Sequence, residues 1–270
     1  MVNKMISIPL LKRNVLQMIK PLMIFFEVLA MYTGIIIFMY TPSLMSVLGD
    51  FEKAMPGMMQ AVGMSGNITS LIGFINVYLY GFIMLGFPMI FIIILGNSLI
   101  MRYVDSGSMA CLLASPNSRH KIIVTQAISM ISAIVVLMTV VTVFGIVCSE
   151  LMFHGELDIK TYIILNASTL LLHLAIAGIV FFSACFFNDS KNFYSVGAGI
   201  PLVFFLINML ANMGGKLENF KFFSIYTLLP KDQIIAGESG VAIYNIALAV
   251  IAIVLFLAGI ISFTKKDFSL

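Results

Sequence analysis

Long, nearly unbroken apolar segments alternate with short polar ones along the whole chain. A helix needs about 20 mainly apolar residues to cross the roughly 30 Å hydrocarbon core of a membrane. Segments of about this length predict spanning helices at residues 21–40, 71–96, 122–148, 162–187, 195–213 and 241–264. The segments lack the alternation of a membrane β-barrel, so the pattern predicts an all-α membrane protein with six transmembrane helices.

The composition agrees with this class, because hydrophobic residues make up 61% of the chain and charged residues only 10%. An ordinary soluble domain has about 45–50% apolar and about 25% charged residues. The net charge of +3 is small and the basic residues are scattered, which excludes a nucleic-acid-binding protein. Cys111, Cys148 and Cys185 lie far apart, outside any paired-cysteine or Cys/His motif, so we expect no metal or redox centre.

The N-terminal segment is basic and amphipathic. Ile8, Leu11, Val15 and Met18 recur at spacings of three and four residues and form one apolar stripe. A basic amphipathic helix lies in the headgroup plane of a membrane rather than across it. We therefore expect an interfacial helix over residues 5–20, the alternative being an ordinary basic flank of the first span.

The distribution of Lys and Arg predicts the orientation of the spans. Ten of the 15 basic residues lie in the N-terminal segment, the second and fourth connections and the C-terminal segment. Basic residues are retained on the cytoplasmic side during insertion, so we expect both termini to be cytoplasmic in a multi-pass protein of a bacterial-type plasma membrane. The connections are short and polar, so residues 1–270 are expected to form a single transmembrane domain.

The connection before the last span, residues 214–240, contains an apolar stretch too short to cross a membrane. Pro230, Lys231 and Asp232 interrupt this stretch. Non-helical backbone persists at membrane depth only where protein covers it or where it lines a cavity. The pattern predicts either a re-entrant helical hairpin that caps the outer side of a pathway or an amphipathic segment on the outer surface.

The connection between spans two and three, residues 97–121, carries a motif. From Met101 the chain reads MRYVDSGSMACLLASPNSRHKI. The motif positions are Asp105, Gly107, Leu112, Leu113, Ser115, Pro116, Ser118 and Arg119. Their order resembles the permeases of type-2 ATP-binding-cassette (ABC) transporters. The chain departs from the usual pattern in having Asp rather than Glu, in placing Ser115 directly before Pro116, and in having Gln126 where a Lys often follows.

The resemblance implies that this connection contains a coupling helix, which docks into a groove of a separate cytoplasmic ABC ATPase. The residues expected to carry coupling are Asp105, Gly107, Met109, Leu112, Leu113, Pro116 and Arg119. Spaced apolar side chains are suited to this task, because they anchor a helix in a groove. The alternative is a solvated turn that only joins two spans. The family's elbow helix and short outer helices would match residues 5–20 and 217–240.

The sequence Gly214-Gly215-Lys216 is not a phosphate-binding loop, because the earlier Gly and the following Ser or Thr are missing. We therefore expect no enzymatic activity and no cofactor in this chain, with ATP and Mg²⁺ bound by the partner ATPase. The resemblance also implies a second permease chain, identical or different, which encloses the route together with this chain in the lipid bilayer.

Polar residues inside the predicted spans are candidates for a substrate pathway. Glu27 and His173 lie within spans one and four, and an ionisable residue at membrane depth often has a function. The further candidates are Asn76, Tyr78, Tyr80 and Asn212. The structural alternatives are a protonated or interfacial Glu27, a His173 bound to a neighbouring carbonyl, and polar side chains that join helices.

The expected function is ATP-driven export, with this chain as the membrane-spanning permease subunit. The resemblance implies an amphipathic drug, a peptide antibiotic or a peptide toxin as the substrate. A secondary transporter or channel is the alternative, although the internal repeat expected of a secondary transporter is not evident. A remote alternative is an intramembrane serine protease, in which Ser65 of Gly63-Met64-Ser65-Gly66 acts with His173 as its base.

Overall fold

Helices make up the fold in a computed structural model, which describes residues 6–64, 68, 70–113 and 117–266. Six helical segments of this described part are long and apolar enough to cross a membrane. They are α1 (Ile8–Phe38), α5 to α6 (Ile83–Asp105), α8 (Arg119–Met152), α9 (Ile159–Phe186), α10 to α11 (Ser190–Asn212) and α13 (Val241–Lys265). The all-α class and the predicted number of helices able to span a membrane are thereby confirmed.

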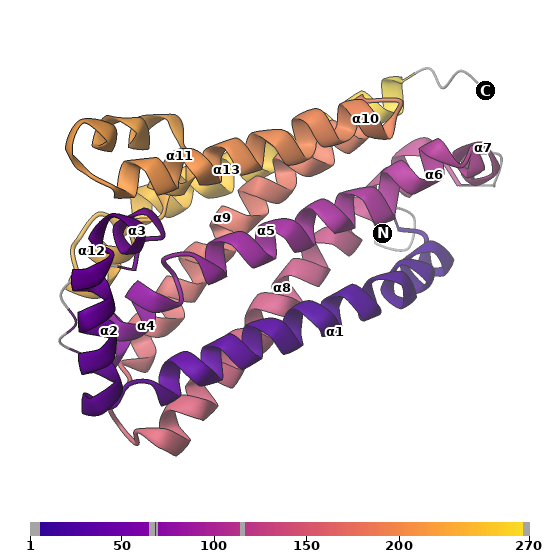
Figure 1. Cartoon of the computed structure of the whole chain (residues 1–270). Coiled ribbons are helices and arrows are strands. Elements are labelled where there is room, and N and C mark those ends of the chain that lie inside the picture. Colours follow the sequence, from indigo (N-terminus) through magenta and orange to yellow (C-terminus); the bar gives the residue numbers. More distant parts are fainter. Residues whose placement is uncertain (1–5, 65–67, 69, 114–116, 267–270) are drawn as a thin grey trace.

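The six segments form an elongated bundle whose two ends carry different short elements (Figure 1). One end, called the α7 end below, holds the start of α1, α6 (Arg102–Asp105), α7 (Ser108–Leu113) and α10 (Ser190–Phe193). The opposite end, called the α12 end, holds α2 (Pro42–Ala54), α3 (Pro56–Ala61), α4 (Leu71–Tyr78) and α12 (Lys231–Ala236). The second and fourth connections therefore lie at the same end as the first and last described residues.

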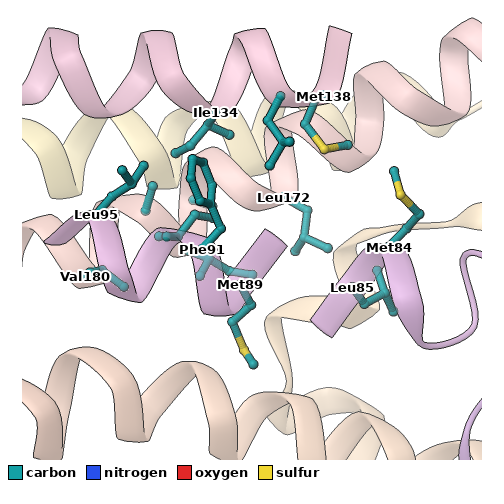
Figure 2. Packing of buried hydrophobic residues seen from close by; sticks show 14 of the residues in the cluster. Met84, Leu85, Met89, Phe91, Leu95, Ile134, Met138, Leu172 and Val180 are labelled. Carbon is teal, nitrogen blue, oxygen red and sulfur yellow. The ribbon is translucent and has the colours of Figure 1, made fainter. Parts of the chain in front are cut away.

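Helices α5 (Ile83–Gly96) and α9 form the centre of the bundle, since they belong to the most buried of the six spans. Figure 2 shows Phe91 and Leu95 of α5 gathered with Ile134 of α8 and Val180 of α9. The outer helices instead expose large apolar side chains. Hydrocarbon is a compatible solvent for such side chains, so the bundle is built to meet lipid on its outside.

Helices α9 and α13 pack most closely, because glycine leaves space where they cross. A Cβ atom added to Gly178 would lie 2.9 Å from Cβ of Leu255, and one added to Gly259 would lie 2.8 Å from Cδ1 of Phe181. Small residues allow two backbones to approach within a membrane, where packing drives helix association. At Gly178 and Gly259 the last span, α13, therefore packs directly against the central span, α9.

The predicted second span at residues 71–96 is wrong in its boundaries. Helix α4 ends at Tyr78, and a turn separates it from α5, which begins at Ile83. The turn brings the backbone of Gly81 against another loop, since a Cβ atom added there would lie 2.6 Å from the carbonyl oxygen of Gly63. The span then continues through a π-helical stretch, Asn97–Met101, to the end of α6.

The predicted helix over residues 5–20 is not a separate element, because α1 continues from Ile8 through Pro21 to Phe38. The inward face of this first part carries Leu10, Asn14 and Met18, all buried. Ile8 and Val15 of the predicted stripe are exposed. The stripe therefore faces partly away from the bundle, and its placement in the headgroup plane stays a prediction.

The segment 214–240 folds into short helices at the α12 end. These are the 3₁₀ helices η4 (Gly215–Phe223) and η5 (Ile225–Leu228), followed by α12. Ile225, Tyr226 and Leu229 pack into the core, whereas Phe222 and Phe223 are exposed. A re-entrant position within the membrane remains a prediction.

Candidate functional site

The connection expected to couple this chain to an ATPase is a turn between two short helices at the α7 end. Helix α6 ends at Asp105, and α7 begins at Ser108. Between them Gly107 adopts a φ of +67°, in the left-handed region that favours glycine. A Cβ atom at Gly107 would have no other atom within 4 Å, so glycine is required here by backbone conformation alone.

Asp105 links this turn to the next connection at the same end. Its carboxylate accepts hydrogen bonds from the backbone N–H of Ser190, at 3.2 Å, and from the Ser190 hydroxyl. Asp189 caps α10, the short helix that begins at Ser190, by accepting a hydrogen bond from the backbone N–H of Asn192 at 2.8 Å. The two hydrogen bonds from Asn192 hold the pKa of the Asp189 carboxyl below its usual value. The turn is thereby tied to the start of the fifth span.

Arg119 and Lys266 make a second link at the α7 end. The Arg119 guanidinium donates to the carbonyl oxygen of Lys266 at 2.7 Å. The Lys266 ammonium donates to the carbonyl oxygens of Cys185, at 3.1 Å, and Phe187, at 2.5 Å, where α9 ends. Burial lowers the pKa of Lys266 to about 8. The start of span three is thus connected to the ends of spans four and six.

The apolar ridge expected on α7 is only partly available for docking. Met109 is 4% exposed and belongs to the core, so it faces the bundle and not a partner. Leu112 is partly buried against the same core. Pro116 lies outside the described residues, as does the side chain of Leu113.

A buried polar cluster joins α1 to α8 near the α7 end, and the sequence reasoning missed it. The Asn14 amide donates to Oε1 of Gln126 at 2.6 Å and to the Ser129 hydroxyl at 2.8 Å. Beside it, the Tyr103 hydroxyl donates to Oε1 of Gln17 at 3.3 Å. The available signal was a pair of polar residues at helical spacing in each segment, Asn14 and Gln17 in the basic N-terminal one and Gln126 and Ser129 in an otherwise apolar one.

The structure does not join Glu27 to His173. Glu27 is exposed on α1, whereas His173 is fully buried in α9 with Nε2 2.8 Å from the carbonyl oxygen of Met84. No hydrogen bond or ion pair between the two is recorded in the part of the chain described. His173 therefore has the backbone partner that the structural alternative required.

Tyr78 and Tyr80 are both buried near the turn that follows α4. The ring of Tyr78 packs 4.7 Å from that of Phe74, measured between centroids. Tyr80 meets Tyr162 of α9 edge-on at 6.5 Å. These contacts place both tyrosines in the packing of the bundle.

A cavity of about 530 Å³ opens at the α12 end and gathers two of the predicted pathway residues. Asn212 lines it directly, together with Asn208, Lys231 and Asp232. Asn76 is connected to it, because its amide donates to Oδ1 of Asp232 at 2.9 Å. Of the pathway candidates, Asn212 and Asn76 therefore belong to this cavity. The others lie elsewhere: Tyr78, Tyr80 and His173 in the core, and Glu27 on α1.

The chain matches the family model described as ABC-2 family transporter protein over residues 12–268. The chain belongs to the ABC-2 transporter family. The search of curated proteins and the search of solved structures gave no match.

This ABC-2 chain is a permease, the membrane subunit of a transporter whose ATP is bound by a separate ABC ATPase. It is a multi-pass membrane protein and not the catalytic subunit. Of the two residues in the protease alternative, Ser65 lies outside the described residues, and Nε2 of His173 lies 2.8 Å from the carbonyl oxygen of Met84. Groups of three or more metal-ligating side chains are absent among the residues described.

Proposed function

We propose that this ABC-2 permease exports an amphipathic drug, a peptide antibiotic or a peptide toxin, driven by a cytoplasmic ABC ATPase that docks on α7. In this arrangement the α7 end and both termini lie in the cytoplasm, as the basic residues indicate. ATP binding moves the docked ATPase, and the turn at Gly107 passes that motion to the spans.

The contacts of Asp105 and Arg119 carry this proposal. Asp105 connects the turn to the start of span five through Ser190, and Arg119 connects span three to spans four and six through Lys266. A push on α7 therefore acts on several spans rather than on a free loop. A solvated turn would not need hydrogen bonds to two distant segments.

The position of Glu27 supports a route between two permease chains. Its side chain is exposed on α1, and a charged group facing hydrocarbon carries a cost of several kcal/mol. A second permease chain or an aqueous route beside α1 removes that cost. We therefore place Glu27 at the route between the chains.

The experiment that tests the proposed coupling is co-purification with the ATPase. The tagged permease is purified from its native membrane, and a co-purifying protein with a Walker A loop is sought by mass spectrometry. Leu112→Asp and Leu113→Asp should abolish the association, because a carboxylate cannot enter an apolar groove without losing its hydration.

The matched control is Leu151→Asp, which places the same charge on a side chain that is 82% exposed at the end of α8. That variant should retain the ATPase. All three proteins must reach the membrane in equal amounts. Undiminished association of both α7 variants would show that the ATPase docks elsewhere.

A further inference from the structure

Two neighbouring cavities at the α12 end differ in chemical character. The lining of the cavity of about 530 Å³ is about half polar, whereas that of a second cavity of about 490 Å³ is mostly apolar. They are called the polar and the apolar cavity below. They share Lys221, Phe222 and Thr227. A molecule with a polar head and a hydrocarbon tail fits such a pair, because each part meets its own kind of surface.

The polar cavity offers one ammonium and three amide groups besides the Lys221 ammonium, which donates to Glu218. Lys231, Asn208, Asn212 and Gln233 line it, and across the described residues no side-chain hydrogen bond is recorded for these four. An amide contributes two N–H donors and an ammonium three. The group that such donors satisfy together is a carboxylate or phosphate.

The acidic side chains of the same cavity are already engaged. Asp232 accepts from Asn76 at 2.9 Å, and Glu218 accepts from Lys221 at 2.7 Å. Burial lowers the pKa of Lys231, with Asp232 opposing this shift. The Lys231 ammonium therefore lies where a positive charge is poorly compensated, which favours an incoming anion over a cation.

The apolar cavity extends from the polar one onto the spanning helices. Ile179 of α9, Phe204 of α11 and Ile251 of α13 line it. Because these residues belong to three spans, the cavity reaches into the part of the bundle that faces hydrocarbon. A tail held here would continue directly from a head held by Lys231.

We propose that the α12 end binds an anionic amphiphile, whose carboxylate or phosphate head is held by Lys231, Asn208, Asn212 and Gln233 and whose tail lies against Ile179, Phe204 and Ile251. The ligand is either a membrane lipid or a soluble amphiphile with the same chemistry. The site does not depend on the proposed coupling, since the permease chain alone forms it.

The absence of tryptophan from the sequence gives a direct test, because a tryptophan at position 222 becomes the only one in the chain. Phe222 borders both cavities and is 76% exposed, so Phe222→Trp is accommodated without disturbing the core. The variant chain is placed in phosphatidylcholine nanodiscs that contain a small fraction of either brominated phosphatidylglycerol or brominated phosphatidylcholine. In a second arm, bromododecanoate is titrated into nanodiscs of phosphatidylcholine alone.

Preferential quenching by brominated phosphatidylglycerol would support the site and identify a membrane lipid as its ligand. Saturable quenching by bromododecanoate would support the site and show that it accepts a soluble amphiphile. In either case Lys231→Gln should weaken the apparent affinity at least about tenfold, the effect of losing one charge-assisted hydrogen bond. Lys231→Arg should retain most of the binding, because it keeps the charge.

Two controls separate this site from general effects of lipid and charge. Lys160→Gln removes an exposed positive charge near the start of α9, outside both cavities, and should leave quenching unchanged. A single tryptophan at Ile253, which is 58% exposed on α13, should not distinguish the two brominated lipids. Equal quenching by both lipids at position 222 without a response to bromododecanoate, or binding unaffected by Lys231→Gln, would overturn the proposal.

Discussion

Single polar side chains inside this bundle have distinct partners, and the partners indicate their tasks. Asn14 bonds to Gln126 and Ser129 on another helix, so it fixes the position of α1. His173 bonds to the carbonyl oxygen of Met84 in α5. Polar hydrogen bonds between helices contribute about 0.6 kcal/mol each on average in a membrane protein. At this scale the interior is held together by small, specific contributions.

Asn14→Leu should therefore lower the free energy of unfolding by about 1 kcal/mol, since it removes two such bonds of about 0.6 kcal/mol each. The measurement is the thermal unfolding midpoint in detergent. Ser132→Ala is the control, because the Ser132 hydroxyl bonds only to the Ser129 carbonyl oxygen of its own helix. An equal shift in both variants would contradict a role for Asn14 between helices.

At the scale of the element, helix starts are determined by capping residues that hydropathy does not detect. The Ser118 hydroxyl accepts from the backbone N–H of Lys121 at 3.2 Å, and Asp158 accepts from that of Thr161 at the same distance. Such caps satisfy a backbone donor that the first helical turn leaves open. Spans three and four consequently begin three residues before the predicted boundaries at 122 and 162.

The turn between α6 and α7 yields a prediction at this scale. Gly107→Ala should impair ATPase association and ATP-driven export, because an alanine at a φ of +67° costs about 1–2 kcal/mol and favours another turn geometry. Gly155→Ala is matched to it, since Gly155 also has a positive φ, of +77°, and open space around it. Gly155 lies in the connection between α8 and α9 and not in the α6–α7 turn.

Vanadate-sensitive ATP hydrolysis by the co-purified complex measures the effect of both glycine variants. Normal activity of Gly155→Ala beside reduced activity of Gly107→Ala is the expected pair of results. Equal activity of the two would show that the conformation of the α6–α7 turn is irrelevant to coupling.

At the scale of the whole molecule, the bundle has two chemically different ends. The α7 end holds the links of Asp105 to Ser190 and of Arg119 to Lys266. The α12 end holds the polar and apolar cavities that share Lys221 and Phe222. We propose that one end receives a partner's motion and that the other holds an amphiphile, so the two proposals concern opposite ends of the bundle (Figure 1).

Cysteine labelling tests which end faces the cytoplasm. Ser106→Cys and His154→Cys are made separately after Cys111, Cys148 and Cys185 have been replaced by serine; both target positions are exposed, at the α7 and α12 ends respectively. A membrane-impermeant maleimide added to intact cells should label position 154 and not position 106. Permeabilised cells should be labelled at both, and labelling of position 106 in intact cells would reverse the orientation.

Much of the site lay outside what the sequence could predict. The motif indicated Asp105 and Arg119, but their partners Ser190 and Lys266 are 85 and 147 residues away. Met109 was expected on a docking ridge and is buried instead. A local pattern shows which residue types are present, whereas the direction in which a side chain points depends on what packs beside it.

The sequence by itself determined the class of this protein and the number of its spans. Lipid cannot satisfy backbone hydrogen bonds, so every sufficiently long apolar segment becomes a helix independently of its neighbours. Only the tertiary structure decided where the second span breaks at Gly81, which polar residues meet, and where the cavities lie. Those features arise from contacts between distant segments, and these contacts exist only once the helices have packed together.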